Sequence, residues 1–109
     1  MITIKIIEPL LKMEFNLSET MRVLTNNKPI YFSWGVSSRV NFHNKGLLLK
    51  VNGHHHKGYV LITLDWTDTY TVTIISTHGN IKNTYDMVYF DDLVEIIDNR
   101  IERIPEYQR

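Results

Sequence analysis

Alternation of apolar and polar positions is the clearest pattern in the chain, and it predicts β-structure in the middle. Across residues 57–76, apolar side chains recur at every second position on both sides of a polar break at Thr67 and Asp68. Such alternation is typical of strands, and a short polar break between two alternating runs predicts a β-hairpin. The preceding run 47–51 ends at Asn52-Gly53, a strong turn signal, and predicts one more strand.

Two further segments carry weaker strand patterns. Ile30, Phe32 and Trp34 alternate with other residues and stop before Gly35, which predicts a strand over residues 30–34. Residues 81–88 follow a turn-forming sequence and predict a short edge strand. Because strands joined by short turns pair in antiparallel fashion, the sequence predicts a four- to five-stranded antiparallel β-meander.

Helical periodicity is found in two segments that flank the predicted meander. Near residues 89–104, apolar residues are three or four positions apart, acidic residues come first, and Arg100 and Arg103 come last, as the helix dipole favours. Near residues 16–26, Asn16 with Glu19 resembles a capping box. Two helices packed on one face of the sheet give an α+β fold. The apolar positions of the C-terminal helix are Phe90, Leu93, Ile97, Ile101 and Ile104.

The length of the chain, 109 residues, is typical of a single domain, which we expect to span residues 1–109. Residues 1–12 are expected to form either a further strand or a peripheral arm. No apolar run approaches the roughly 20 residues that span a bilayer, and the N-terminal residues lack the apolar centre of a signal peptide. With no cysteine present, we expect a soluble, cytoplasmic protein without disulfides and without a membrane partner.

The net charge of zero hides a strong asymmetry along the sequence. Between Thr20 and Leu64 there is no acidic residue, yet this segment holds 6 of the 12 lysines and arginines. Basic side chains neutralise phosphates and interleaved aromatic rings can stack on bases, so nucleic-acid binding is one predicted function. The residues expected to carry it are Arg39, Lys45, Lys50 and Lys57.

Candidate chemistry is sparse. No glycine-rich phosphate loop, nucleophile elbow or paired-carboxylate motif fixes a reaction, so we expect a protein without enzymatic activity and without a cofactor. In an extended segment His54 and His56 would project to the same side and could share a metal ion, but no cysteine or nearby carboxylate completes the ligand set. A metal-binding protein or a small hydrolytic enzyme is therefore the weaker alternative. The loop Ser37-Ser38-Arg39 is a candidate cradle for an anion.

Protein binding is the leading functional prediction, because helices on one face of an antiparallel sheet leave its other face open. That face would mix aromatic, aliphatic and basic side chains, which are residue types that anchor interfaces. We expect a small module that binds another protein or a second copy of itself. The residues expected to bind the partner are Tyr31, Arg39, Phe42, Leu48, Lys50, Tyr59 and Leu61.

The composition bears on the origin of the chain. Alanine is absent, while isoleucine, asparagine and threonine are abundant, as in proteins encoded by AT-rich genomes. Short proteins without a chemical motif are common in mobile elements. We therefore expect an accessory or inhibitor protein of a phage or mobile element.

Overall fold

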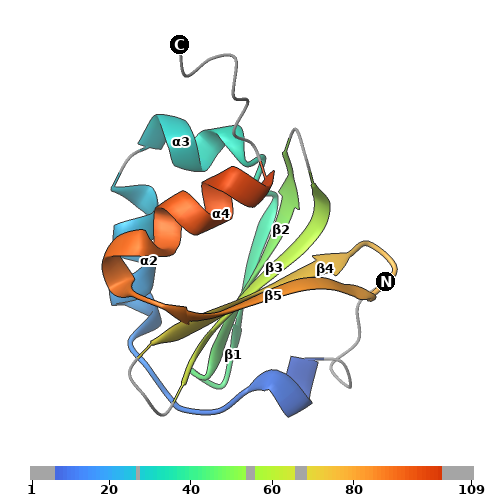
Figure 1. The fold of residues 1–109 in the computed structure, drawn as a ribbon. Coiled ribbons are helices and arrows are strands. Elements are labelled where there is room, and N and C mark those ends of the chain that lie inside the picture. Colours follow the sequence, from blue (N-terminus) through green and yellow to red (C-terminus); the bar gives the residue numbers. More distant parts are fainter. Residues whose placement is uncertain (1–6, 27, 54–55, 66–68, 102–109) are drawn as a thin grey trace.

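Five strands form one antiparallel sheet in the computed structural model, which describes residues 7–26, 28–53, 56–65 and 69–101 (Figure 1). Each strand pairs with the next one along the chain, in the order β1-β2-β3-β4-β5. This confirms the predicted α+β class and the antiparallel meander, and the hairpin predicted over residues 57–76 contains β3 and β4. The strands are β1 (Ser38–Phe42), β2 (Gly46–Asn52), β3 (Lys57–Leu64), β4 (Tyr70–Ser76) and β5 (Ile81–Val88).

Helices cover one face of this sheet, and the main hydrophobic core lies between the two layers (Figure 1). The strands contribute Leu49, Ile62 and Ile74 to this core, all fully buried. None of the described helices is long and apolar enough to cross a membrane. The helices are α2 (Leu17–Thr25), α3 (Lys28–Ser33) and α4 (Leu93–Ile101), with short 3-10 turns η1 (Glu8–Leu10) and η2 (Phe90–Asp92).

The two predicted helices are confirmed as α2 and α4. Asn16 caps α2 as predicted, since its side-chain oxygen accepts a hydrogen bond from the Glu19 backbone N–H at 3.1 Å. In α4, the apolar stripe at Leu93, Ile97 and Ile101 is fully buried. Phe90 does not belong to that stripe, because it lies in the η2 turn and is exposed. Ile104 lies outside the described residues.

The strand predicted over residues 30–34 is wrong, because this segment forms α3. Pro29 is tolerated in the first turn of a helix, and Gly35, with φ +63°, ends it in the left-handed conformation. The positions taken for alternation are also helical neighbours, since Ile30 and Trp34 are four residues apart. Phe32 in this helix is left exposed, while Trp34 in the turn after it is buried in the core. Five residues are too few to distinguish the 3.6-residue period of a helix from the 2-residue period of a strand.

The strand that actually precedes β2 is β1, in a segment expected to be a polar loop. Val40 pairs with Leu48 and Phe42 with Gly46. The connecting turn contains His43 and Asn44, both with positive φ. As the first strand in the sheet, β1 is exposed along most of its length. Its sequence alternates Val40 and Phe42 with Arg39 and Asn41, but the run is short.

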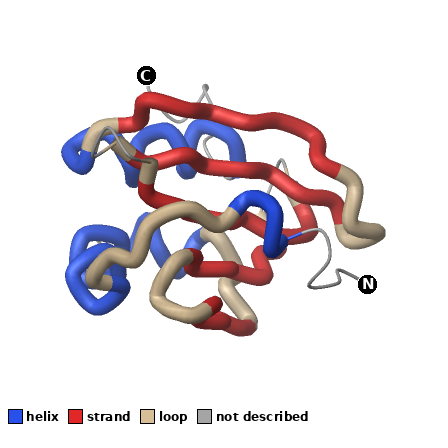
Figure 2. The backbone as a smooth tube through the Cα atoms, turned by 90° about the horizontal axis from the view of Figure 1, so that it is seen from below, coloured by secondary structure: helices blue, strands red, loops and turns tan. Residues whose placement is uncertain are grey.

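The sheet face opposite the helices was expected to be open, but the N-terminal segment covers part of it. Ile7, Leu10 and Leu11 from the η1 region pack on Leu48, Leu61 and Ile75, forming a second and smaller hydrophobic cluster. Figure 2 shows this segment crossing the strands on the side away from the helices. These apolar side chains of the second face are therefore core residues. Of the segment 1–12, expected to form a strand or an arm, residues 1–6 lie outside the described ranges, and residues 7–12 contain η1 and no strand.

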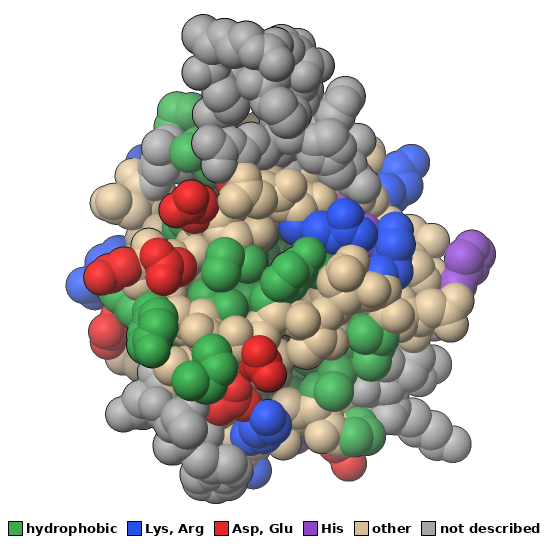
Figure 3. Space-filling model, in the orientation of Figure 1, with side chains coloured by type: hydrophobic (Ala, Val, Ile, Leu, Met, Phe, Trp, Pro, Cys, Tyr) green, Lys and Arg blue, Asp and Glu red, His purple; other side chains and the backbone are tan. Residues whose placement is uncertain are grey.

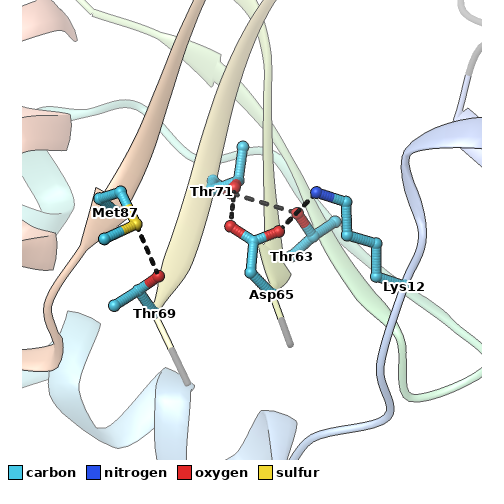
Figure 4. Close-up of polar contacts among 6 residues, drawn as sticks. All are labelled: Lys12, Thr63, Asp65, Thr69, Thr71 and Met87. Atoms are coloured by element: carbon cyan, nitrogen blue, oxygen red, sulfur yellow. Dashed lines mark hydrogen bonds and ion pairs between the residues drawn. The ribbon is translucent and has the colours of Figure 1, made fainter. Parts of the chain in front are cut away.

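Polar contacts fasten the same segment to the end of the sheet (Figure 4). The Lys12 ammonium lies 2.6 Å from Asp65 Oδ1, and the Thr71 hydroxyl donates to Asp65 Oδ2 at 2.5 Å. Burial raises the pKa of the Asp65 carboxyl, but the hydrogen bonds from Lys12 and Thr71 and the lysine charge outweigh burial and lower it. Met13 adds an isolated bridge to Leu64. The segment after η1 is thus anchored by charge and by backbone pairing.

Leu48 and Val40 are cross-strand neighbours that differ mainly in burial, with exposed fractions of 4% and 41%. We expect Leu48→Asp to lower the free energy of unfolding by at least about 3 kcal/mol, because it buries an unpaired carboxylate and leaves a cavity. The matched control Val40→Asp should cost less than about 1 kcal/mol. Urea denaturation followed by circular dichroism measures both. Equal costs would contradict the assignment of Leu48 to a covered face.

Candidate functional site

A cleft of about 440 Å³ opens between α3 and β1, at one edge of the sheet. Two basic side chains, an exposed aromatic ring and two serines line it, and no aspartate or glutamate is among its described lining residues. We call it the α3–β1 cleft. Its lining residues are Thr25, Lys28, Tyr31, Phe32, Gly35, Val36, Ser37, Ser38 and Arg39.

The helical wall of the cleft is fixed by aromatic residues of α3 and the turn after it. Trp34 is fully buried, and its indole N–H donates to Asp98 Oδ1 on α4 at 3.0 Å. The Tyr31 ring packs against Trp34 with 5.6 Å between ring centroids. These contacts turn one face of α3 toward the core. Lys28 and Phe32 lie outside that face and line the cleft.

The loop at the base of the cleft is pinned to β2 by backbone hydrogen bonds. The Asn52 N–H donates to the Trp34 carbonyl at 3.0 Å, and the Ser37 N–H donates to the Lys50 carbonyl at 2.9 Å. Gly35 passes so close that a Cβ atom there would lie 2.6 Å from the Asn52 carbonyl oxygen. Because Gly35 also has φ +63°, this position requires glycine. The cleft is therefore a rigid feature of the fold.

The charged groups of the cleft are available for a ligand. Within the described ranges, neither Lys28 nor Arg39 forms an ion pair or a side-chain hydrogen bond, and Phe32 is 69% exposed. Two unpaired cations beside serine hydroxyls favour an anion, and an exposed ring favours a flat apolar group. The Ser37-Ser38-Arg39 loop was a sequence candidate for this role. Lys28 and Phe32 were not, because residues 30–34 were assigned to a strand.

The seven residues predicted to bind a partner do not form one surface. Tyr31 is buried in α3, while Leu48 and Leu61 are buried beneath the η1 region. Phe42 and Tyr59 are half-buried against the same cluster. The remaining two, Arg39 and Lys50, are exposed. The apolar members of the set thus contribute to packing, and only the charged members face solvent.

The basic residues predicted to bind nucleic acid are also spread over the sheet. Lys45 lies in the turn before β2, whereas Lys57 pairs with Asn52 at the other end of that strand, about 20 Å away at roughly 3.3 Å per residue. Lys50 pairs with Ser38, so its side chain and that of Arg39 lie on opposite faces of the sheet. Of the four residues, Arg39 alone lines the α3–β1 cleft.

A second notable surface lies at the opposite edge of the sheet, along β5. Ile81, Met87, Tyr89 and Phe90 are large, exposed hydrophobic residues, and we call this set the apolar edge. Figure 3 shows apolar side chains gathered where β5 leads into η2 and α4, with acidic side chains beside them. In the part of the chain that is described, β5 pairs with β4 and with no other strand. Large apolar groups beside a free strand edge mark a surface suited to association.

The histidines do not come together as a metal site. His56 is buried, with 2% of its surface exposed, and its Nε2 donates to the Tyr59 carbonyl at 3.3 Å. Among the described residues, its Nδ1 has no hydrogen-bond partner. His54 lies outside the described residues, and no group of three or more His, Cys, Asp or Glu that could hold a metal ion occurs within the described ranges. His56 is therefore a packed residue of the β2–β3 hairpin.

Comparisons with protein-family models, with curated proteins and with solved structures gave no match.

Burial lowers the pKa of His56, and the nearby charges of Lys82 and Arg100 lower it further, whereas the hydrogen bond to the Tyr59 carbonyl and the nearby backbone of Ile75 raise it. The unfolded chain therefore takes up a proton near pH 6.5, whereas the folded protein takes it up at a lower pH. We expect the free energy of unfolding to be constant above about pH 7 and to fall below pH 6.5, by up to about 1.4 kcal/mol per pH unit.

Urea denaturation between pH 7 and pH 5 measures this slope. The variant His56→Gln cannot titrate at this position and should flatten the slope, while the control His78→Gln, at an exposed turn, should keep it. The same slope in wild type and His56→Gln would contradict the assignment.

Proposed function

We propose that the protein is a protein-binding module that docks through the outer edge of β5, and that the partner this edge fits is a second copy of the chain. The supporting observation is the apolar edge, with Ile81 50% and Met87 55% exposed at the two ends of the same edge strand. An edge strand adds a partner strand through its free backbone groups, and side chains set the specificity. An accessory or inhibitor role in a phage or mobile element, and a cytoplasmic location, stay predictions from the sequence.

The sequence of β5 is complementary to itself when read in the antiparallel direction. A two-fold axis at Thr84 would set Ile81 opposite the partner's Met87 and Lys82 opposite the partner's Asp86. The first pair joins two exposed apolar side chains, and the second joins opposite charges that form no ion pair within the described residues. Both pairs occur twice by symmetry. A self-complementary surface of this kind is what a two-fold dimer requires.

The faces of the strand agree with this pairing. Ile81 pairs with Ile75 and Thr84 with Thr73, residues whose side chains lie on the face away from the helices. The next residue, Val88, pairs with Tyr70 and packs in the core on the helix side, so Met87 is expected on the opposite face. Its sulfur lies 3.8 Å from the Thr69 hydroxyl (Figure 4). Across the axis, Ile81 and the partner's Met87 would therefore share a face and could pack together.

Irregular pairing at both ends of β5 bears on the same question. The register with β4 shifts next to Ile81 and again before Val88, and Met87 has φ +56°. Such bulges often protect an edge from pairing. Here the bulges lie on both sides of the regular segment 83–85. In a two-fold dimer, the bulge at one end of β5 would face the bulge at the other end of the partner's β5. The bulges would then restrict the edge to a partner of the same shape.

Charge reversal tests the pairing most sharply. We expect Lys82→Glu and Asp86→Lys each to weaken the dimer roughly tenfold at low salt, because two symmetry-related pairs become repulsive. A mixture of the two variants should recover association, since their heterodimer pairs opposite charges at both positions. Sedimentation equilibrium over a range of protein concentrations measures the dissociation constants.

The control is Lys45→Glu, which makes the same charge change in the turn between β1 and β2. It should leave the dissociation constant unchanged. A protein that stays monomeric at all concentrations would overturn the proposed self-association, and a dimer insensitive to both reversals would place the interface elsewhere.

A further inference from the structure

We propose that the α3–β1 cleft binds a nucleotide unit, with the phosphate held by Lys28 and Arg39 and the base stacked on Phe32. The cleft lies at the β1 edge of the sheet, whereas the apolar edge belongs to β5 at the opposite side. The inference is thus independent of the proposed dimer, and either one can fail without the other.

The charge and size of the cleft suit a phosphate-bearing ligand. Its volume of about 440 Å³ falls within the range of small-molecule sites. Lys28 and Arg39 have no counterion among the described residues, and Ser37 and Ser38 add hydroxyl donors. No described carboxylate lines the cleft to repel an anion. A guanidinium and an ammonium with nearby hydroxyls form a typical donor set for phosphate oxygens.

Phe32 distinguishes a nucleotide from a simple anion. Its ring is 69% exposed, although its neighbours Tyr31 and Trp34 are buried. Tyr31 and Phe32 meet edge to face, with 5.9 Å between ring centroids, so this contact does not use both faces of the Phe32 ring. An exposed ring beside unpaired cations matches the way proteins bind single nucleotides, by stacking a base and neutralising its phosphate.

The site is held in place before a ligand arrives. Trp34 ties α3 to α4, and the hydrogen bond from the Ser37 N–H to the Lys50 carbonyl ties the loop to β2. Gly35 lets the loop pass close to Asn52. Binding therefore needs little backbone ordering, which favours affinity.

The test uses the whole chain and three probes: inorganic phosphate, adenosine monophosphate and a short single-stranded oligo-dA, each titrated by calorimetry at low salt. We expect adenosine monophosphate to bind more tightly than phosphate. Phe32→Ala should lower the affinity for adenosine monophosphate about tenfold and leave that for phosphate unchanged. The double variant Lys28→Gln with Arg39→Gln should lose both. All three side chains are exposed, so the folded state should be kept, which circular dichroism verifies.

The matched control is Lys45→Gln with Lys57→Gln, which removes the same charge from the acid-free segment without touching the cleft. It should bind like wild type. The oligonucleotide distinguishes a site for a free nucleotide from a site for a nucleotide within a single strand. If it binds more tightly than adenosine monophosphate and its log affinity falls with log salt at a slope near −1.4, the site takes a nucleotide within a single strand. If it binds no better, the site takes a free nucleotide.

Two results would overturn the inference. One is the absence of binding by adenosine monophosphate and by the oligonucleotide. The other is an equal loss of affinity in the cleft variant and in the Lys45 and Lys57 control, which would assign binding to general charge.

Discussion

The burial of Trp34 is the contact on which the rest of the architecture depends. Its side chain is fully buried in the core between sheet and helices, its indole N–H donates to Asp98 on α4, and its carbonyl accepts a hydrogen bond from Asn52 at the end of β2. One residue therefore fixes α3, α4 and β2 relative to each other. Gly35 follows directly in the left-handed conformation. It lets the chain turn from α3 toward β1 while the residues on both sides stay hydrogen-bonded to β2.

The two edges of the sheet differ as a consequence. At the β1 edge, α3 and the pinned loop close over the strand and leave a basic cleft. At the β5 edge, the described part of the chain provides no covering strand or helix, and large apolar residues stay exposed. Both faces of the sheet are largely shielded from solvent, because the helices cover one face and the η1 region covers the apolar part of the other. Surfaces suited to binding are therefore found at the edges.

The sequence predicted the elements that carry a strong periodic signal. Apolar side chains at every second position over 57–76 predict strands, and the stripe from Leu93 to Ile101 predicts a helix. Runs of that length distinguish a period of 2 residues from a period of 3.6. Residues 30–34 were too few for that distinction and were assigned to a strand. β1 alternates only at Val40 and Phe42, and most of the strand is exposed, so its strand pattern is short and weak. The cover over Leu48 and Leu61 could not be foreseen either, because it comes from a distant segment of the chain.

The candidate sites were predictable only in part. The acid-free segment and the Ser37-Ser38-Arg39 loop are visible in the sequence, and both contribute to the α3–β1 cleft. Lys28 and Phe32 join them only once α3 is known to be a helix. Residues 81–88 were predicted as an edge strand, and β5 confirms this. The apolar edge was still missed, because the exposure of Ile81 and Met87 depends on which other segments cover that edge.

Hydrogen–deuterium exchange at low and high protein concentration tests the central claim, that β5 is the edge through which the protein binds a second copy. The account predicts that amides within 81–87 become more protected as concentration rises, while those of β1 at the opposite edge do not change. Protection of β5 that does not depend on concentration, or equal changes at both edges, would contradict it.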